Sequence, residues 1–539
     1  MTETPGVAQG SDLDIGGFSD VGPWRIDPER VAWRRGLGPL REQIAAEVPN
    51  LLAPGHVPPL GRVAAACWEV GTALGIWALT ERRLEQSPRR AALSRRLRVA
   101  FARLGPTYIK LGQIISSGEG LFPPELVGEF KLLRDRVPAE SFDHVRRVVE
   151  AELGGRIETL FSEFSREPIA AASIAQVHAA RLATGEEVVV KVQRPKIGTR
   201  VRDDIRALAW LAPKLVGRIP VAALANPPAL VKLFADTIVE ELDFRLEAQN
   251  MLDVARVLAE TGQRAVIVPR PHPRYVTRRV LVMERLDGFA WDDVVGMQGA
   301  GVDTEAVLHA GLVAFMEGAM LYGVFHGDLH GGNLLVRPDG RTVLLDFGIT
   351  GRLDPARRMA FLFLLLGATT GDVRAQLGAL RDLGAFPPDI DLEAVISDLG
   401  LEGPVVDPTT LGADELLAQL QDITKKLLGY GARAPKELML FVKNMMVLDG
   451  AIATLAPDLD IIGEIEEVHG EIARRHGERL AAEMGIEIDA ATFDADAMKA
   501  AMGVDPSVEK LTYRDVQERR DTIRTRLEET RKGRRSGRP

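Results

Sequence analysis

The sequence contains almost no cysteine: Cys67 is the single one in 539 residues. No disulfide can form within the chain, so a reducing, cytoplasmic setting is expected. Aromatic residues are also scarce at 5%, and they do not alternate with basic residues. Because the formal net charge is −9, nothing in the composition points to a nucleic-acid partner.

Long uninterrupted apolar runs are missing as well. The best candidate, residues 63–79, carries Glu69 in its interior, and residues 359–368 are too short to cross a bilayer. The N-terminus is acidic and polar, so we expect neither a secretory signal nor a spanning segment. Membrane contact would then be peripheral, at the inner face, through the apolar face near 63–79 or the basic end "RKGRRSGRP". The alternative for that end is a solvated, disordered tail.

Periodicity and composition divide the chain into five segments. We expect a flexible leader (1–60), a helical extension (61–165), a small β-rich lobe (166–288), a helical lobe (289–455) and a charged helical tail (456–539). In the β-rich lobe, two or three strands surround a turn at Thr184-Gly185, and one long amphipathic helix covers 236–260. This order predicts an α+β fold with two lobes and a cleft between them.

Two short motifs carry the main chemical signal. In "VFHGDLHGGNLLV" (324–336), Asp328 and Asn333 are five residues apart, as in a kinase catalytic loop. The motif "LLDFG" then places Asp346 after the next predicted strand, where a magnesium-binding carboxylate is expected. Each motif alone is common, since Asp-Phe-Gly is an ordinary strand-end turn. Together they predict phosphoryl transfer from a nucleotide, with Asp328 orienting the acceptor and Asn333 and Asp346 binding Mg²⁺.

A cation for the phosphates is available upstream. Lys191 lies in the strand-like "VVVKV", and Glu247 lies on the helix predicted over 236–260. Such a Lys–Glu pair would hold the lysine over the phosphates. A lysine after three valines is by itself only the edge of a strand, so the prediction depends on the ordered set of features.

Two parts of a protein kinase are absent. No Gly-x-Gly-x-x-Gly loop precedes Lys191, and "AAASIAQVH", with Ala170–Ala172 and Ser173, stands in its place. No Ala-Pro-Glu follows Asp346, and little room is left for an activation segment before the helix expected at 355. The chain is therefore not expected to phosphorylate extended peptides.

These motifs, together with "EELDFRLEAQN", "VMERLDG", "PTYIKLGQIISS" and "FPPELVGEFKLLRDRVP", resemble the UbiB/AarF family of atypical kinases. The resemblance runs from about 95 to about 455. It implies a protein-kinase-like fold, binding of ATP or ADP with Mg²⁺, and kinase or ATPase activity. It also implies a role in the biosynthesis or distribution of isoprenoid quinone lipids, so an isoprenoid or quinone lipid is expected as a partner besides the adenine nucleotide. This chain departs from the family in "SSGEGLFPPEL" and in its charged, rather than hydrophobic, end.

The resemblance also assigns residues to the site. Its catalytic residues would be Asp328, Lys191, Asn333 and Asp346, the last two as metal ligands. Its nucleotide-binding residues would be Ala170, Ala171, Ala172, Ser173, Lys191, Glu247, Glu284, Leu286, Lys110, Gln113, Glu241 and Asp243. Lys110 and Gln113 lie one helical turn apart among apolar residues and are expected on a helix that covers the cleft, with Glu241 and Asp243 as acidic partners. The alternative for the pair is an ordinary polar helix face.

The sequence also suggests roles for three histidines, and it leaves two alternative functions open. We expect structural hydrogen bonds for His326 and His178, whereas His330 could orient the loop or touch phosphate.

A small-molecule phosphotransferase of the aminoglycoside or choline kinase type also uses a His-Gly-Asp loop, but it should lack the Lys110 helix and the alanine-rich loop. A nucleotide-sensing scaffold for a lipid-modifying complex would perform no chemistry, and nucleotide hydrolysis with and without lipid would separate it from an enzyme.

Overall fold

A computed structural model describes most of the chain, in two compact units. The described residues are 17–20, 22–53, 58–84, 86–116, 122–133, 138–215, 227–401, 422–423, 426–427, 429–433, 435–486, 495–496, 499, 507–508, 510–522 and 525. The first unit comprises Met1–Ala255, Val268–Leu286 and Asp346–Ile349, and the second comprises Arg256–Ile267, Asp287–Leu345 and Thr350–Pro539. The basic end "RKGRRSGRP" lies outside the described residues.

The first unit contains an antiparallel sheet in the order β1-β3-β4-β7-β6, with β2 paired to β3. Its strands are β1 (Phe161–Phe164), β2 (Ala170–Ala171), β3 (Ala175–Leu182), β4 (Glu187–Gln193), β6 (Pro271–Val276) and β7 (Val280–Glu284). The predicted hairpin is confirmed: β3 and β4 pair from Ala175↔Gln193 to Arg181↔Glu187. Gly185 in the connecting turn has φ +106°, a conformation that glycine adopts without strain.

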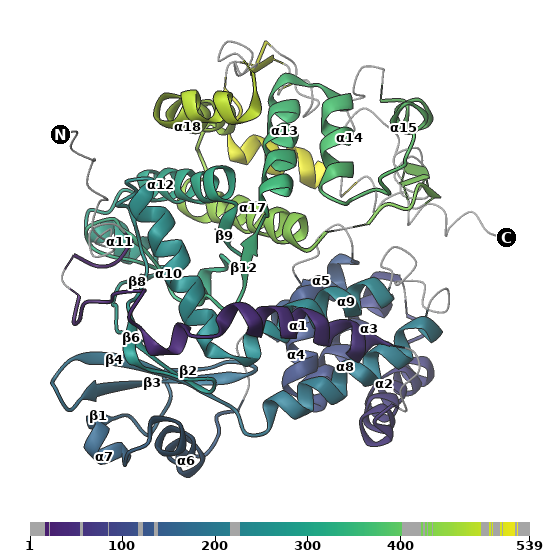
Figure 1. Ribbon diagram of the computed structural model, residues 1–539. Coiled ribbons are helices and arrows are strands. Elements are labelled where there is room, and N and C mark those ends of the chain that lie inside the picture. The colour runs from purple at the N-terminus through teal and green to yellow at the C-terminus, as the bar shows by residue number, and fades with distance from the viewer. Residues whose placement is uncertain are drawn as a thin grey trace, which may run out of the picture. The chain divides into compact units, whose positions relative to one another are not determined.

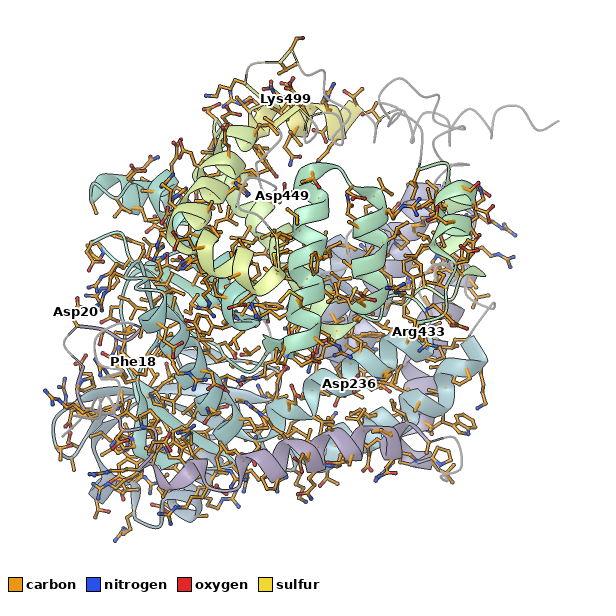
Figure 2. All side chains as sticks on the ribbon, turned by 45° about the horizontal axis from the view of Figure 1, so that its top comes forward. Phe18, Asp20, Asp236, Arg433, Asp449 and Lys499 are labelled. Carbon is orange, nitrogen blue, oxygen red and sulfur yellow. The ribbon has the colours of Figure 1, made fainter. Side chains whose placement is uncertain are left out.

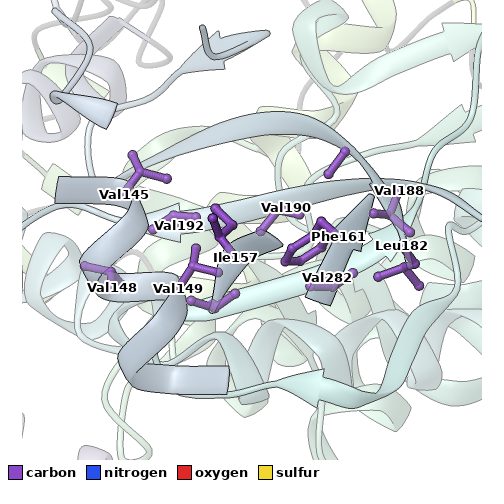
Figure 3. Close-up of a cluster of buried hydrophobic side chains, with 12 residues drawn as sticks. Val145, Val148, Val149, Ile157, Phe161, Leu182, Val188, Val190, Val192 and Val282 are labelled. Atoms are coloured by element: carbon purple, nitrogen blue, oxygen red, sulfur yellow. The ribbon is translucent and has the colours of Figure 1, made fainter. Parts of the chain in front are cut away.

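One face of this sheet packs against helix α6 (Phe142–Leu153). Val145, Val148 and Val149 share one face of α6 because they are three and four residues apart. They pack with Val190 and Val192 of β4 in a cluster of fully buried side chains (Figure 3). Burying each such side chain contributes about 1.5–3 kcal/mol, so this cluster fixes the position of β4.

The remaining elements of the first unit are helices (Figure 1). They are η2 (Ala32–Arg34), α1 (Leu37–Leu52), α2 (Leu60–Thr80), α3 (Gln86–Leu104), α4 (Pro106–Ser116), α5 (Pro124–Lys131), α7 (Ile157–Leu160), α8 (Ile197–Leu215), α9 (Pro227–Ile238), η4 (Glu240–Leu242) and α10 (Phe244–Glu260), whose end from Arg256 belongs to the second unit. Helix α4, which carries Lys110 and Gln113, begins at Pro106, because proline is tolerated in the first helical turn.

The single helix predicted over 236–260 was wrong. The chain leaves the helical conformation at Asp243, which has φ −136° and ψ 105° and separates η4 from α10. The Asp243 carboxylate accepts a hydrogen bond from the backbone N–H of Arg245, which starts the new helix, and Phe244 N–H donates to the Arg278 carbonyl. Periodicity alone does not reveal this break, because an aspartate that binds its own backbone competes locally with the helix.

Part of the predicted leader is held against the sheet of the first unit. Phe18, labelled in Figure 2, forms a β-bridge with Val268, and its side chain is 2% exposed. Ser19 Oγ donates to Glu284 Oε1 at 2.5 Å, and the Arg270 guanidinium donates to the Ser19 carbonyl. The segment before α1 therefore contributes polar contacts to the end of β7.

The second unit combines helices with two small sheets, β5-β11-β10-β8 and β12-β9. Its elements are β5 (Val266–Ile267), β8 (Phe289–Ala290), α11 (Val294–Gly299), α12 (Thr304–Glu317), the π-helical turn η5 (Gly318–Tyr322), β9 (Val324–His326), η6 (Gly331–Asn333), β10 (Leu334–Val336), β11 (Thr342–Leu344), β12 (Thr350–Arg352), α13 (Pro355–Thr370), α14 (Val373–Asp382), α15 (Leu392–Leu399), α17 (Lys436–Leu455) and α18 (Ile461–Met484). The α+β class predicted from the sequence is confirmed.

Three helical segments are long and apolar enough to cross a membrane by length and composition alone. They are Leu60–Thr80, Thr304–Tyr322 and Lys436–Leu455. Sequence reasoning weighed only the first and rejected it because of Glu69. In the structure Glu69 lies within 3.6 Å of Arg103 of α3, and the expectation of no spanning segment stays a prediction.

Candidate active site

Strand β4 positions Lys191 in the first unit. Side chains alternate between the two faces of a strand, so Val190 and Val192 enter the cluster below α6 while Lys191 points to the opposite face. There its Nζ lies 2.6 Å from Glu247 Oε1 and 3.2 Å from Asp346 Oδ2. The structure thus brings together the strand lysine, the helix glutamate and the aspartate of Asp-Phe-Gly.

Burial and the neighbouring charges act against each other in this ion-pair network. Desolvation opposes the charge of Lys191, but the nearby carboxylates of Asp346 and Glu247 raise the pKa of its ammonium above the ordinary value. Burial raises the pKa of Glu247 to about 7, although Lys191 acts in the opposite direction. The Lys191 ammonium therefore stays charged at neutral pH and is the fixed cation of the site.

The acidic residues before Glu247 have separate partners. Glu241 Oε1 lies 2.9 Å from Lys110 Nζ of α4, so the predicted Lys110–Glu241 contact is present. Asp243 pairs with Arg245 and not with Lys110. Its two carboxylate oxygens accept hydrogen bonds from the Arg245 guanidinium at 2.9 and 2.7 Å. Gln113 is half-buried one turn further along α4. Only one of the two predicted acidic residues thus pairs with the α4 lysine.

The alanine-rich loop forms a short antiparallel pair. Ala170 and Ala171 pair with Val177 and Gln176 of β3, and Ala172 N–H donates to the Ala175 carbonyl. Ala170 and Ala172 are exposed, whereas Ser173 is buried. The exposed alanines leave the loop backbone accessible, and their contact with a nucleotide stays a prediction.

The two other predicted nucleotide contacts lie at the end of β7. The Glu284 carboxylate is buried and accepts hydrogen bonds from Ser19 Oγ and from Arg270 N–H at 3.2 Å. Leu286 is half-buried two residues further on. The observed bonds of Glu284 are structural, and a role of either residue toward nucleotide stays a prediction.

Histidine 178, on β3, is a structural residue of the sheet. Its two ring nitrogens lie 2.8 Å from Gln176 Nε2 and 2.8 Å from the Ser165 carbonyl. Burial lowers the pKa of this imidazole, which favours the neutral form. This arrangement agrees with the structural role expected from the sequence.

In the second unit, the Asp328 loop is braced by helix α17. Lys443 Nζ donates to Asp328 Oδ1 at 2.6 Å. The neighbouring Asn444 is fully buried; its amide oxygen accepts from Leu329 N–H at 3.0 Å, and its amide nitrogen donates to the His326 carbonyl at 2.5 Å. Two adjacent residues of α17 therefore fix both the carboxylate and the backbone of the loop.

The loop also stabilises itself. His326 Nδ1 accepts from the Asp328 N–H at 3.1 Å, and Asn333 Nδ2 donates to the Asp328 carbonyl at 3.0 Å. His330 caps the turn η6 by accepting from Gly332 N–H, and its Nε2 lies 3.7 Å from Asp328 Oδ2. The imidazole of His330 thus orients the loop, which is one of the two roles expected for it.

Sequence reasoning missed Lys443 and Asn444. They lie 115 residues or more from Asp328 and Leu329 along the chain, so no local motif joins them to the loop. A signal was present in "FVKNMM", where a lysine and an asparagine interrupt an apolar helix. Polar side chains in such a helix need partners, and this was the argument already applied to Lys110.

The donor groups in each unit suit a magnesium-bound polyphosphate. In the first unit, the carboxylates of Glu241, Glu247 and Asp346 lie beside the ammonium groups of Lys110 and Lys191. Burial raises the pKa of Glu241 and the Asp346 carboxylate acts in the same direction, whereas Lys110 lowers it. A divalent cation beside Asp346, whose side chain is 41% exposed, would neutralise negative charge in this group of carboxylates.

The corresponding oxygen ligand of the second unit is the Asn333 amide. Its amide nitrogen donates a hydrogen bond to the Asp328 carbonyl. Its amide oxygen is the type of ligand that Mg²⁺ prefers. Asn333 and Asp346 belong to different units, and joint binding of one ion by the two residues stays a prediction.

Comparison with known proteins finds relatives among atypical kinase-like proteins. The ABC1 atypical kinase-like domain matches residues 132–378. An uncharacterized protein of Mycobacterium tuberculosis is 37% identical over 434 residues, covering 77% of this chain and 86% of the relative. An uncharacterized chloroplastic aarF domain-containing protein kinase of Arabidopsis thaliana is 33% identical over 391 residues, covering 68% and 72%. The probable protein kinase UbiB of Aeromonas hydrophila is 32% identical over 378 residues, covering 68% of each chain.

Among solved structures, a Mycobacterium tuberculosis protein in complex with erythromycin aligns at 22% identity. The alignment covers 61% of this chain and 89% of that chain, with a TM-score of 0.36. The domain match and the relatives confirm the predicted protein-kinase-like fold.

Proposed function

Because the chain belongs to the UbiB/AarF family of ABC1 atypical kinase-like proteins, we propose that it is an ATP-dependent phosphotransferase or ATPase that supports the biosynthesis or distribution of an isoprenoid quinone lipid. The observation that carries the proposal is the network of Lys191, Glu247 and Asp346. A nucleotide-sensing scaffold could use the same lysine to bind phosphates, so turnover is the property that separates it from an enzyme. A small-molecule phosphotransferase is disfavoured because α4 with Lys110 and the alanine-rich loop are both present.

The roles follow from the chemistry of each group. Lys191 binds nucleotide phosphates with a charge that Glu247 orients. Asp346 and Asn333 hold Mg²⁺, which when bound neutralises charge on the phosphates. Asp328 accepts a hydrogen bond from the acceptor, a hydroxyl or a water molecule, and Lys443 fixes its carboxylate. The adenine nucleotide, ATP or ADP, is the ligand of this site.

Peptide substrates are excluded in this proposal. Lys110 anchors α4 to Glu241, six residues before Glu247. Only eight residues separate Asp346 from the start of α13 at Pro355, and β12 occupies three of them. No segment remains in that interval to shape a peptide groove, so the acceptor is a small molecule or water.

Nucleotide hydrolysis tests the enzymatic part of the proposal. We expect magnesium-dependent release of phosphate from ATP, stimulated by vesicles that contain a quinone-like lipid. Lys191→Met should lower this turnover by roughly a hundredfold, because charge stabilisation of the phosphates is lost. Release of phosphate that is equal in wild type and Lys191→Met, or absent in both with and without lipid, would favour the scaffold.

A peripheral membrane contact is the second part of the proposal, and α2 supports it. All its exposed positions are uncharged: Leu60, Gly61, Ala64, Cys67, Trp68, Gly71, Leu74, Gly75, Ile76, Ala78, Leu79 and Thr80. Leu60, Trp68 and Leu79 are 70%, 73% and 88% exposed. An apolar face of this length that carries a tryptophan is typical of a helix lying in the membrane interface.

Charge indicates the kind of membrane. Residues 60–104, which contain α2 and α3, carry nine arginines and three glutamates, a net charge of +6 in a chain whose total is −9. Arg82 and Arg83 are exposed directly after the apolar face. The α2 surface is therefore proposed to bind a bilayer that contains anionic lipids.

The single cysteine makes this contact measurable without engineering. Cys67 lies on the exposed face of α2, so an environment-sensitive fluorophore attached to it should shift to the blue when vesicles containing phosphatidylglycerol are added. The shift should weaken with salt. Leu79→Glu should weaken vesicle binding at least about tenfold, because a charge then enters the interface.

A matched control separates the α2 face from general hydrophobicity. Val295→Glu changes a valine that is 83% exposed on α11 and should leave vesicle binding within about twofold. Equal losses in both variants would count against the α2 surface. Cross-linked dimers through Cys67 without vesicles would instead identify the face as a contact between two copies.

A further inference from the structure

The first unit contains a cavity that shares no residue with the Lys191 network. It has a volume of about 770 Å³ and lies between the segment before α1, the start of α10 and the β6–β7 hairpin. Its walls are built by residues 25–33, by Arg245 and by residues 273–278. This volume falls within the range of about 300–1,000 Å³ of small-molecule sites.

The walls are fixed by specific contacts. Trp24 Nε1 donates to the Pro271 carbonyl at 3.0 Å, and its ring meets the His272 ring edge-on. On the other side, Arg34 Nε donates to Gln249 Oε1 of α10 at 2.8 Å. The segment before α1 is therefore tied at both ends to the elements that form the rest of the cavity.

The cavity is strongly basic. Its twelve lining residues include five arginines and a single acid, Asp27; the arginines are Arg25, Arg30, Arg245, Arg274 and Arg278. Arg30 lies 3.2 Å from Asp27, whereas neither Arg274 nor Arg278 forms an ion pair within the described part of the chain. Arg245 is already paired with Asp243, so the guanidinium groups of Arg274 and Arg278 are the ones that would receive an anion. Guanidinium groups bind phosphate through paired N–H donors, which makes phosphate the matching anion.

The floor of the cavity is apolar. Val31, Trp33 and Val276 line it and are 6%, 7% and 4% exposed. A free inorganic anion would gain nothing from these side chains. The ligand that uses both the rim and the floor carries a phosphate group and an apolar portion.

The cavity also borders the break in the chain at Asp243. Arg245 lines it, and the partner of that guanidinium is the Asp243 carboxylate. Asp243 lies between Glu241, which pairs with Lys110, and Glu247, which pairs with Lys191. A phosphate at Arg245 would therefore share the guanidinium with a residue at the start of the helix that carries Glu247.

We propose that this arginine-lined cavity is a second ligand site, which binds a phosphorylated organic molecule with an apolar portion. The same chemistry is offered by a soluble organophosphate and by the headgroup of a phospholipid. The site is independent of nucleotide at Lys191, so its test does not depend on the proposed activity.

Titration calorimetry in the absence of magnesium tests the proposal with three probes. Phenyl phosphate should bind more tightly than inorganic phosphate, because its ring reaches the apolar floor. Dihexanoyl phosphatidic acid, kept monomeric, represents the lipid headgroup: affinity at least about tenfold above that of phenyl phosphate assigns the site to a lipid, and equal or lower affinity assigns it to a soluble organophosphate. Both assignments support the site.

Paired variants decide whether the cavity is the place of binding. Arg274→Gln with Arg278→Gln removes two exposed guanidinium groups and should weaken phenyl phosphate at least about tenfold. The charge-matched control, Arg95→Gln with Arg156→Gln, changes two exposed arginines elsewhere in the first unit and should keep the affinity within about twofold. Lys191→Met should bind like the wild type.

Three results would overturn the site. These are absence of binding by phenyl phosphate and by phosphatidic acid at millimolar concentration, an equal loss of affinity in the control pair, and a loss in Lys191→Met without a loss in the Arg274/Arg278 pair. Unchanged thermal unfolding midpoints in both double variants ensure that the comparison concerns binding and not folding.

Discussion

Replacing Asp346 by asparagine should remove most magnesium-dependent nucleotide binding. Asp346 is the partly exposed carboxylate of the Lys191 network, and its loss leaves Mg²⁺ without its main anionic ligand. We expect the affinity for Mg-ATP, measured by thermal-shift titration, to fall by roughly a hundredfold or more, whereas the small affinity for ATP without magnesium should change little.

The stability of the ligand-free protein provides an internal check. Asp346→Asn removes one of three neighbouring carboxylates, which relieves their mutual repulsion and should not lower the unfolding midpoint. Asp354→Asn is the matched control, because Asp354 is similarly exposed and caps α13, a task that asparagine performs equally well. Unchanged Mg-ATP affinity in Asp346→Asn would show that the metal binds elsewhere.

Replacing Lys443 by methionine should lower turnover with little effect on nucleotide binding. The ammonium of Lys443 holds the Asp328 carboxylate at 2.6 Å, and Asp328 is the group proposed to orient the acceptor. We expect kcat for ATP hydrolysis to fall roughly a hundredfold, the scale of a misplaced general base, while the affinity for Mg-ATP stays within about threefold.

A conservative substitution at Lys443 distinguishes a role in positioning Asp328 from a role in stabilising the fold. Lys443→Arg keeps a cation beside Asp328 and should restore part of kcat, whereas a purely structural lysine would be rescued only in the unfolding midpoint. Lys436→Met, at the first residue of the same helix α17, should leave kcat within about twofold. A parallel loss of kcat and Mg-ATP affinity in Lys443→Met would contradict the assignment.

Local patterns predicted the elements that local forces determine. The β3–β4 hairpin follows from the strand-like residues around the Thr184-Gly185 turn, and α4 follows from the helical spacing of Lys110 and Gln113 among apolar residues. The pairing of Lys191 with Glu247 spans 56 residues, yet the order of motifs predicted it because a phosphate-binding lysine needs such a partner. A contact can therefore be predicted over a long sequence distance when few residue types can meet the chemical requirement.

Contacts of polar side chains that many different residues could satisfy were not predictable from the sequence. Asp243 was assigned to Lys110, but Arg245 is two residues away and satisfies it locally. Glu284 binds Ser19, a residue of the predicted leader, and nothing in the periodicity of either segment indicates this contact. Asn444 reaches Leu329 from 115 residues away. In each case a buried polar group found one partner among many equivalent ones, and only the tertiary structure selects it.

The division of the chain has a mechanical consequence for the candidate site. The backbone passes from one unit to the other five times, after Ala255, Ile267, Leu286, Leu345 and Ile349. The first passage lies within the continuous helix α10, which resists bending. The last two are four residues apart and enclose Asp-Phe-Gly-Ile. Any reorientation of one unit against the other would therefore carry Asp346 along with Lys191 and Glu247 as one body, and the backbone φ and ψ angles on either side of that tetrapeptide would have to change with it.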